Sequence, residues 1–219
     1  MKSIQIPLVD FEGQDLDSAL ELHGARFDVD SVNWPDQFPY APFCSGRIAR
    51  TKDALVVDFR VSGLDLRAMN TEDNCHQWED SCVEVFIKDP GNGNYYNFEI
   101  NALGKVLACI GTSREGRIAR PAQEMEEILR FGDRLPVAAG NDLNPAGNDL
   151  EGLQSWRVGV VIPFHLIGID PENLPESISA NFYKCGDKTA HPHFVSWNPV
   201  GTEKPDFHRP EFFGKLILK

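Results

Sequence analysis

The sequence predicts an all-β fold: a jelly-roll-like β-sandwich of two antiparallel sheets with a few short helices. Three observations support this prediction. Short runs that alternate apolar and polar residues recur along the chain, Gly, Pro, Asn or Asp bounds most of them, and segments with helical periodicity are few. The length of 219 residues suits one all-β domain spanning 1–219, and the hydrophobic content of 42% suffices for a full core.

Nine segments are predicted strands. In chain order they are residues 4–8, 46–50, 54–61, 81–88, 95–102, 105–110, 156–162, 178–185 and 215–218. The DPGNGN run at 89–94 is a strong turn signal, so we expect the fourth and fifth strands to form a hairpin. A second tight turn at Leu103-Gly104 extends this hairpin to a three-stranded meander.

Three short helices and one insertion complete the prediction. Residues 15–23 and 124–130 each suit two helical turns, and residues 163–168 suit one. Residues 132–154 are polar, and the pentapeptide AGNDL occurs in them twice. Solenoid repeats are much longer than five residues, so we interpret the segment as a slipped duplication that forms a mobile surface loop.

The composition narrows the function classes. A net charge of −12 and a pI of about 4.9 argue against nucleic acid and anionic membranes as partners, because both require a basic surface. This acidity fits a neutral or cationic ligand, although it also serves solubility. The five cysteines contain no CxxC pair, and the N-terminus has no apolar signal segment. The printed sequence therefore indicates a soluble protein.

Polar residues gather on one face of three predicted strands. Side chains alternate along a strand, so Val83, Val85 and Ile87 share the core face of 81–88. The opposite faces of the three strands carry carboxylate or amide side chains, namely Glu84, Asn97, Glu99, Asn101 and Asn181. A solvated sheet face is one interpretation. Short amides and paired glutamates beside a tryptophan favour a site of fixed hydrogen-bond donors and acceptors.

Saccharides require such a site, because their C–H faces stack on aromatic rings and their hydroxyls need oriented polar groups. Trp78 lies in the polar loop NCHQWED, which is unusual for a core tryptophan. Trp197 suits a ligand contact or the core equally, whereas Trp156 opens an alternating strand and is predicted to be buried. Residues 181–214 form an unusually aromatic irregular segment, which predicts either a rigid wall of a ligand site or a plug at the end of the fold.

Five motifs in order resemble those of the family 9 carbohydrate-binding modules, in particular the stand-alone proteins of gut-type bacteria. They are DNCHQWEDSCVEVFI, YYNFEINALG, NFYKCGD, PHFVSWNP and PDFHRPEFFG, and the resemblance extends from about residue 33 to the end of the chain. It implies a non-catalytic protein of polysaccharide utilisation, which clamps the end of a glucan or xylan chain between two tryptophans. It also implies structural calcium, a periplasmic or extracellular location and a glycoside hydrolase as partner. The calcium ligands cannot be assigned from the spacing.

The resemblance also suggests which residues bind the sugar. Trp78 matches the first stacking tryptophan and Glu84 a sugar-binding carboxylate, while Trp197 would form the second face of the clamp. The remaining polar contacts would come from the neighbouring strands, through Asn97, Glu99, Asn101 and Asn181. We expect the amides to keep the site wet and both glutamates ionised.

Two enzyme classes remain as alternatives. Glu84 and Glu99 could face the same side of neighbouring strands and act as the carboxylate pair of a glycoside hydrolase. A zinc enzyme is the second alternative, with ligands drawn from His191, His193, Asp206 and His208. Pro192 and the surrounding phenylalanines favour simple loop packing for these histidines.

Overall fold

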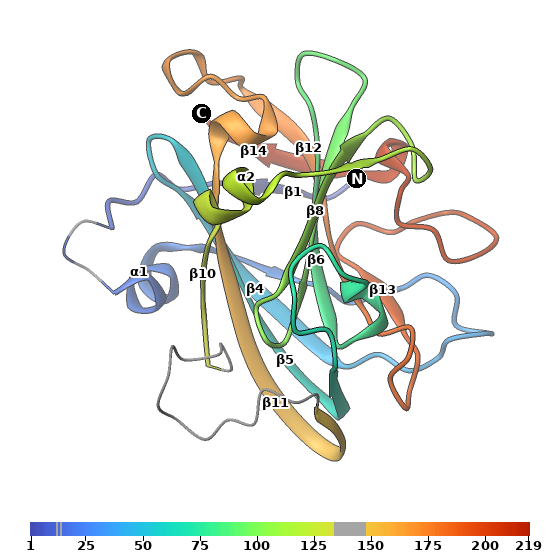
Figure 1. Ribbon diagram of the computed structural model, residues 1–219. Helices are drawn as coiled ribbons and strands as arrows, with labels where there is room; N and C mark the ends of the chain where they lie inside the picture. Colours follow the sequence, from blue (N-terminus) through green and yellow to red (C-terminus); the bar gives the residue numbers. More distant parts are fainter. Residues whose placement is uncertain (12, 14, 134–147) are drawn as a thin grey trace.

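Two sheets pack face to face in the computed structural model, which describes residues 1–11, 13, 15–133 and 148–219 (Figure 1). The strands are β1 Ser3–Gln5, β2 Ala25–Asp28, β3 Ser31–Val32, β4 Phe43–Arg50, β5 Ala54–Ala68, β6 Cys82–Lys88, β7 Tyr95–Asn101, β8 Val106–Gly111, β9 Ile118–Ala119, β10 Leu129–Gly132, β11 Asn148–Pro163, β12 Ser177–Cys185, β13 Phe194–Ser196 and β14 Gly214–Ile217. Sheet A has the order β1-β14-β12-β6-β7-β8-β9, with β13 and β3 attached beside β12. Sheet B has the order β10-β11-β5-β4-β2. Neighbouring strands are antiparallel, apart from the parallel pair β1 and β14. The predicted β-sandwich is confirmed.

All nine predicted strands are present, and the five that the sequence did not indicate are short. These five are β2, β3, β9, β10 and β13, which have two to four residues each. Runs of this length carry little alternation of their own, and pairing with a longer neighbour creates them. β5 is also longer than predicted, because β11 pairs with it from Ala54 to Ala68.

The predicted hairpin of β6 and β7 is present, and the structure defines its register. Glu84 pairs with Glu99, and Phe86 pairs with Asn97. The turn between the strands is held by Asp89, whose Oδ1 accepts hydrogen bonds from the backbone N–H groups of Gly91 and Asn92. β8 continues the meander as predicted.

The helices are short and follow local capping signals. They are α1 Leu16–His23, α2 Ala122–Glu127 and the 3-10 helices η1 Gln77–Glu79, η2 Phe164–Ile167, η3 Pro171–Asn173 and η4 Pro210–Phe212. The side chain of Asp15 caps α1 by accepting from the Ser18 N–H. The prediction of a helix over 124–130 is wrong at its C-terminal end, because residues 129–132 pair with β11 and form β10.

Most of the predicted insertion, residues 134–147, lies outside the described residues. Its C-terminal part is not a loop. Residues 148–154 belong to β11 and pair with β5, from Ala68 to Gly63. The prediction failed here because this part of β11 has a polar, glycine-containing sequence and gains its strand structure from backbone pairing with β5.

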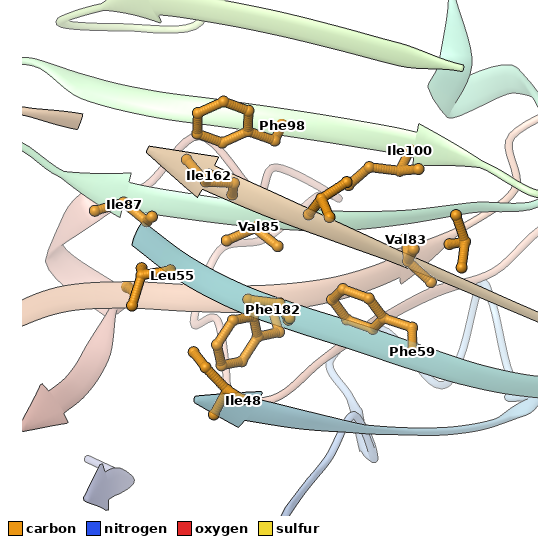
Figure 2. Packing of buried hydrophobic residues seen from close by; sticks show 14 of the residues in the cluster. Ile48, Leu55, Phe59, Val83, Val85, Ile87, Phe98, Ile100, Ile162 and Phe182 are labelled. Carbon is orange, nitrogen blue, oxygen red and sulfur yellow. The ribbon is translucent and has the colours of Figure 1, made fainter. Parts of the chain in front are cut away.

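The main core lies between the two sheets (Figure 2). Val83, Val85 and Ile87 point inward from β6, as their alternation predicted, and Phe98 and Ile100 point inward from β7. They meet side chains of sheet B that include Ile48, Leu55, Phe59 and Ile162. Trp156 is 3% exposed and belongs to the same core, which agrees with its prediction.

None of the helices in the described part of the chain has the length and apolar character needed to span a lipid bilayer.

Candidate functional site

The outer face of sheet A is covered by residues 197–213, which connect β13 to β14 and are irregular apart from η4. We call them the covering segment. Side chains of this face pack with Trp34 and with three residues of the covering segment, namely Val200, Phe207 and Phe213. The result is a second, smaller hydrophobic cluster on the side of sheet A that faces away from sheet B. We call it the outer cluster, and its fully buried members on the sheet are Cys82, Phe86, Tyr95, Tyr183 and Cys185.

The covering segment leaves a cavity of about 120 Å³ over the middle strands of sheet A. Its walls combine aromatic rings, carboxylates and guanidinium groups. They are formed by Trp78, Glu84, Glu99, Arg114, Arg117, Cys185, Asp187, Phe194, Pro205, Asp206, Phe207 and His208. The residues come from segments distant in sequence, so only the folded chain brings them together. This cavity is the candidate functional site.

Two glutamates from neighbouring strands line the cavity. Glu84 is 3% exposed and Glu99 is 2% exposed, and they stand directly opposite each other in the β6–β7 pair. Glu99 Oε1 accepts from Asn97 Nδ2 at 3.0 Å and forms an ion pair with Arg117 at 3.4 Å. Glu84 Oε1 accepts from the thiol of Cys185 at 3.1 Å. The second oxygen of each carboxylate, Oε2, has no hydrogen-bond partner among the described residues.

Burial changes the ionisation of both glutamates. Burial raises the pKa of Glu99 to about 7, against the lowering effect of Arg117. Burial raises the pKa of Glu84 well above its ordinary value, and the neighbouring charge of Glu99 raises it further. The expectation that both groups stay wet is therefore wrong, because the C-terminal segment covers a sheet face that the sequence alone presents as open. This burial acts against the expected ionisation of both glutamates.

Trp78 lies at the edge of the cavity on the 3-10 helix η1. The indole is half-buried, and the imidazole of His76 stacks on it with ring centroids 4.5 Å apart. Two backbone hydrogen bonds fix this helix to the loop after β12, from Asp187 N–H to the Trp78 carbonyl and from Lys188 N–H to the Glu79 carbonyl. Trp78 is thus held in place by the loop that also supplies Asp187 to the cavity.

A second aromatic wall comes from β13 and the covering segment. Phe194 and Phe207 line the cavity with Pro205 and His208. Phe207 is fixed by stacking on Tyr183, with ring centroids 4.0 Å apart. The aromatic segment at 181–214 therefore forms a wall of the site, which is one of the two roles predicted for it.

The polar rim contains four charged residues that the sequence analysis did not assign to a saccharide site. Arg114 and Arg117 follow β8, Asp187 follows β12, and Asp206 belongs to the covering segment. Partial burial raises the pKa of Asp187 to about 6, although Arg114 acts in the opposite direction. The sequence analysis did not select Asp187, because nothing local shows that its loop faces a cavity.

Three predicted amides serve the fold and do not line the cavity. Asn97 holds Glu99 in place. Asn101 Oδ1 accepts from the backbone N–H groups of Leu103 and Lys105, and its Nδ2 donates to Asp80. Asn181 Nδ2 donates to the backbone carbonyl of Asn198, and Asn181 Oδ1 accepts from the backbone N–H of Asn198. The predicted placement of Asn101 beside the ligand is wrong, because its amide oxygen is used by the turn after β7 and its amide nitrogen by Asp80 and the Asn70 carbonyl.

Trp197 does not face the cavity. It is 3% exposed, belongs to the main core, and packs beside Phe182 with ring centroids 5.4 Å apart. The prediction that Trp78 and Trp197 flank one pocket is therefore wrong. Both tryptophans occupy irregular or short elements, and only the path of the chain decides that one turns outward and the other inward.

The histidines of the zinc-enzyme alternative are dispersed among separate partners. His191 pairs with Asp65, His193 Nε2 lies 2.7 Å from Lys184 Nζ, and His208 Nδ1 lies 2.9 Å from the Tyr95 hydroxyl. They do not share a centre, so this alternative is not supported.

One cluster in the described ranges brings at least three His, Cys, Asp or Glu ligand atoms together. It consists of Cys82, Glu84 and Cys185. Calcium takes oxygen ligands, so the two thiols do not fit the structural calcium that the family resemblance implies. The calcium site stays a prediction.

Comparison with known proteins places the chain in a family. Residues 14–218 match the sequence model of carbohydrate-binding family 9. The chain belongs to this family. A search of curated proteins gave no match.

Solved structures agree with the family 9 assignment. A candidate carbohydrate-binding protein from Bacteroides uniformis is 32% identical, with a TM-score of 0.86, and the match covers 100% of this chain and 99% of the other. A family 9 module from Caldicellulosiruptor kristjanssonii in complex with glucose is 12% identical, with a TM-score of 0.59 and coverages of 100% and 96%. The complex of a family 9 module from that organism with cellotriose gives 12% identity, a TM-score of 0.55 and coverages of 100% and 94%. At 12% identity these two likenesses concern the fold alone.

Proposed function

We propose that this protein binds a saccharide in the cavity beside Trp78 and does not hydrolyse it. The single observation that carries the proposal is the pairing of a half-buried indole with two buried carboxylates that each keep an oxygen without a partner. Buried acceptors without partners are costly, so a ligand that supplies hydroxyl donors would be bound. The family assignment supports the same ligand class.

Each wall of the cavity has a role in this proposal. Trp78 offers an aromatic surface for the C–H face of a sugar ring, and Phe207 contributes apolar surface from the other wall. Glu84 and Glu99 accept hydrogen bonds from hydroxyls, whereas Arg114 and Arg117 can donate to ring or hydroxyl oxygens. Donors and acceptors in fixed positions orient the sugar.

The size of the cavity favours a chain end over a chain interior. At about 120 Å³ it lies well below the ~300 Å³ at which pockets for larger ligands begin. A single sugar unit fits this scale better than several consecutive units do. We therefore propose a terminal sugar of a glucan or xylan as the ligand, with a glycoside hydrolase as a partner that acts on the same polysaccharide.

The hydrolase alternative meets an objection in the contacts of Glu99, whereas the strand pairing is compatible with the carboxyl separation of about 5–5.5 Å in a retaining glycosidase. Glu84 and Glu99 are directly paired, and the Cβ atoms of paired residues are about 4.5–5.5 Å apart on the same face of a sheet. A glycosidase places its two carboxyl groups on either side of the scissile bond. Glu99 is also engaged by Arg117 and Asn97. Two acceptors side by side suit recognition of hydroxyls.

Calorimetric titration with glucose, cellotriose and xylotriose tests the proposal. Trp78→Ala should weaken binding at least about tenfold, because loss of stacking costs on the order of 1 kcal/mol beyond the loss of buried area. Phe43→Ala is the matched control, since Phe43 is an aromatic residue that is 59% exposed and does not line the cavity. Equal affinity of wild type and Trp78→Ala for every saccharide that binds would contradict the proposed site.

Two further measurements test whether the protein recognises a reducing chain end and whether it hydrolyses the saccharide. Borohydride reduction of the terminal sugar should abolish binding of cellotriose or xylotriose if a reducing chain end is recognised. Prolonged incubation with xylan, cellulose and aryl glycosides should give no product. Turnover that disappears in Glu84→Gln would replace the binding proposal with the hydrolase.

A further inference from the structure

A compact group of three potential metal ligands adjoins the cavity. Cys82 on β6 stands directly opposite Cys185 on β12, and Glu84 lies two residues further on the same face of β6. The two sulfur atoms and a carboxylate oxygen all lie within 4.8 Å of one another. These side chains are 0%, 1% and 3% exposed, respectively. The strand pairing therefore sets the spacing of the three ligand atoms, and they do not depend on a loop for their positions.

The hydrogen bonds within this group are weak or incomplete. The Cys82 thiol donates to the carbonyl of its own neighbour Val83 at 3.5 Å, and the Cys185 thiol donates to Glu84 Oε1 at 3.1 Å. Glu84 Oε2 has no hydrogen-bond partner, and in the described ranges no cation pairs with this carboxylate. A thiol is a weak donor, so it does little to offset the burial of a carboxylate. The cation of the cavity that acts on Glu84, Arg117, is itself paired with Glu99.

We propose that Cys82, Cys185 and Glu84 bind a zinc ion at the floor of the cavity. Zinc accepts two thiolates and a carboxylate with small adjustments of side chains, and it prefers four ligands in a tetrahedron. Copper(I) is less suited, because it favours sulfur ligands and the carboxylate would contribute little. Calcium and magnesium are unsuited because they require oxygen ligands.

Three protein ligands leave one coordination position open. Glu84 and Cys185 line the cavity, whereas Cys82, opposite Cys185 in the sheet, does not. The fourth position therefore faces the cavity, where water can complete the tetrahedron. The cavity is also the route by which the ion reaches ligands that are otherwise buried.

Binding exchanges protons for the ion. Burial raises the pKa of Cys82 to about 12, and burial also raises the pKa of Cys185. Cysteine binds zinc as a thiolate, so zinc displaces one proton from each thiol, together with any proton on Glu84. The ion, two thiolates and one carboxylate leave a net charge of −1 at the centre.

Cobalt(II) titration of the reduced, metal-free full-length chain tests the site without any saccharide. Cobalt is the probe because its visible absorption reports tetrahedral geometry, and thiolate ligands add a sulfur-to-cobalt charge-transfer band in the near ultraviolet. We expect one equivalent of cobalt to bind with both signals, and we expect added zinc to remove both. Cys82→Ser should lose about half of the charge-transfer intensity and at least about tenfold in zinc affinity.

The chain offers a matched control in Cys75, which is half-buried in the loop before η1 and lies outside the group. Cys75→Ser should bind cobalt as the wild type does. Glu84→Gln should keep the charge-transfer band and lower zinc affinity, because it removes the carboxylate and retains both thiols. Circular dichroism confirms the fold of each variant. If Cys82→Ser fails to fold, Cys185→Ser takes its place and should lose about half of the charge-transfer intensity. The intensity of this band in the wild type also reports directly whether two thiolates bind the cobalt ion.

Two outcomes would overturn the proposal. One is that the reduced wild type binds neither cobalt nor zinc, in which case the two cysteines serve only as small apolar groups in the outer cluster. The other is that Cys82→Ser and Cys185→Ser give the same charge-transfer spectrum as the wild type, which would place the bound ion elsewhere. A negative result here leaves the saccharide proposal intact, because its test requires no metal.

Discussion

His208 offers a direct test of how the covering segment buries the outer face of sheet A. Its imidazole packs on Phe86 with ring centroids 4.9 Å apart, and its Nδ1 lies 2.9 Å from the hydroxyl of Tyr95. Burial lowers the pKa of His208 from 6.5 to about 2, and the charges of Arg117 and Arg114 act in the same direction. The folded protein therefore holds this histidine neutral, whereas the unfolded chain protonates it below its ordinary pKa.

The sign and size of the effect follow from this difference. Below pH 6.5 the unfolded state binds a proton at this position that the folded state excludes, so stability falls as the pH falls. Each pH unit below the unfolded pKa costs about 1.4 kcal/mol, which gives about 2 kcal/mol between pH 7.5 and pH 5. His193 contributes in the same direction, while the raised pKa values of Glu99 and Asp187 contribute in the opposite direction. The pH dependence of wild-type stability therefore combines the contributions of several titrating groups.

The difference between wild type and His208→Gln isolates the histidine. Urea unfolding at several pH values should show that the variant is less stable at pH 7.5, because packing is lost. That loss of stability relative to the wild type should shrink by about 2 kcal/mol at pH 5. The reason is that the unfolded variant has no imidazole at position 208 to bind a proton. Tyr95→Phe is the matched control: it removes the hydroxyl and keeps the buried imidazole, so its deficit should change little with pH. A deficit for His208→Gln that stays constant from pH 7.5 to pH 5 would refute the reasoning.

Three further predictions concern the packing around Trp197 and the hydrogen bonds of Asn101. Trp197→Ala should destabilise the protein by about 3–5 kcal/mol in urea unfolding, as loss of a large core side chain does. A small effect would contradict the burial of Trp197 in the core. Gly214→Ala should cost about 1–3 kcal/mol, because its Cβ would collide with the Trp197 ring; an unchanged melting temperature would contradict this packing. Asn101→Ala should cost about 1–3 kcal/mol, since the backbone N–H groups of Leu103 and Lys105 lose their acceptor. Loss of saccharide affinity without loss of stability in Asn101→Ala would instead assign this amide to the ligand.

The sequence by itself determined the sandwich and the composition of its inner faces. Alternation places Val83, Val85 and Ile87 on one face of β6 whatever the rest of the chain does, because successive side chains of a strand point to opposite sides. The turn residues at 89–94 likewise predict the hairpin of β6 and β7, in which the structure then places Glu84 opposite Glu99. These are local properties, and the structure confirms them. The assignment to family 9 agrees with the motifs from which it was inferred.

Only the tertiary structure decided which side chains share the cavity. Trp78 and Trp197 have equally irregular surroundings in the sequence, yet the first is fixed at the cavity by the loop after β12 and the second is buried between the sheets. Asn101 shares a strand face with Glu99, but its amide oxygen accepts from the turn after β7 and its amide nitrogen donates to Asp80 and to the Asn70 carbonyl. The physical reason is that alternation assigns a residue to a face, whereas contacts between distant segments decide what covers that face. The path of the chain after β12 brings Phe207 over the glutamates, and that burial raises their pKa values.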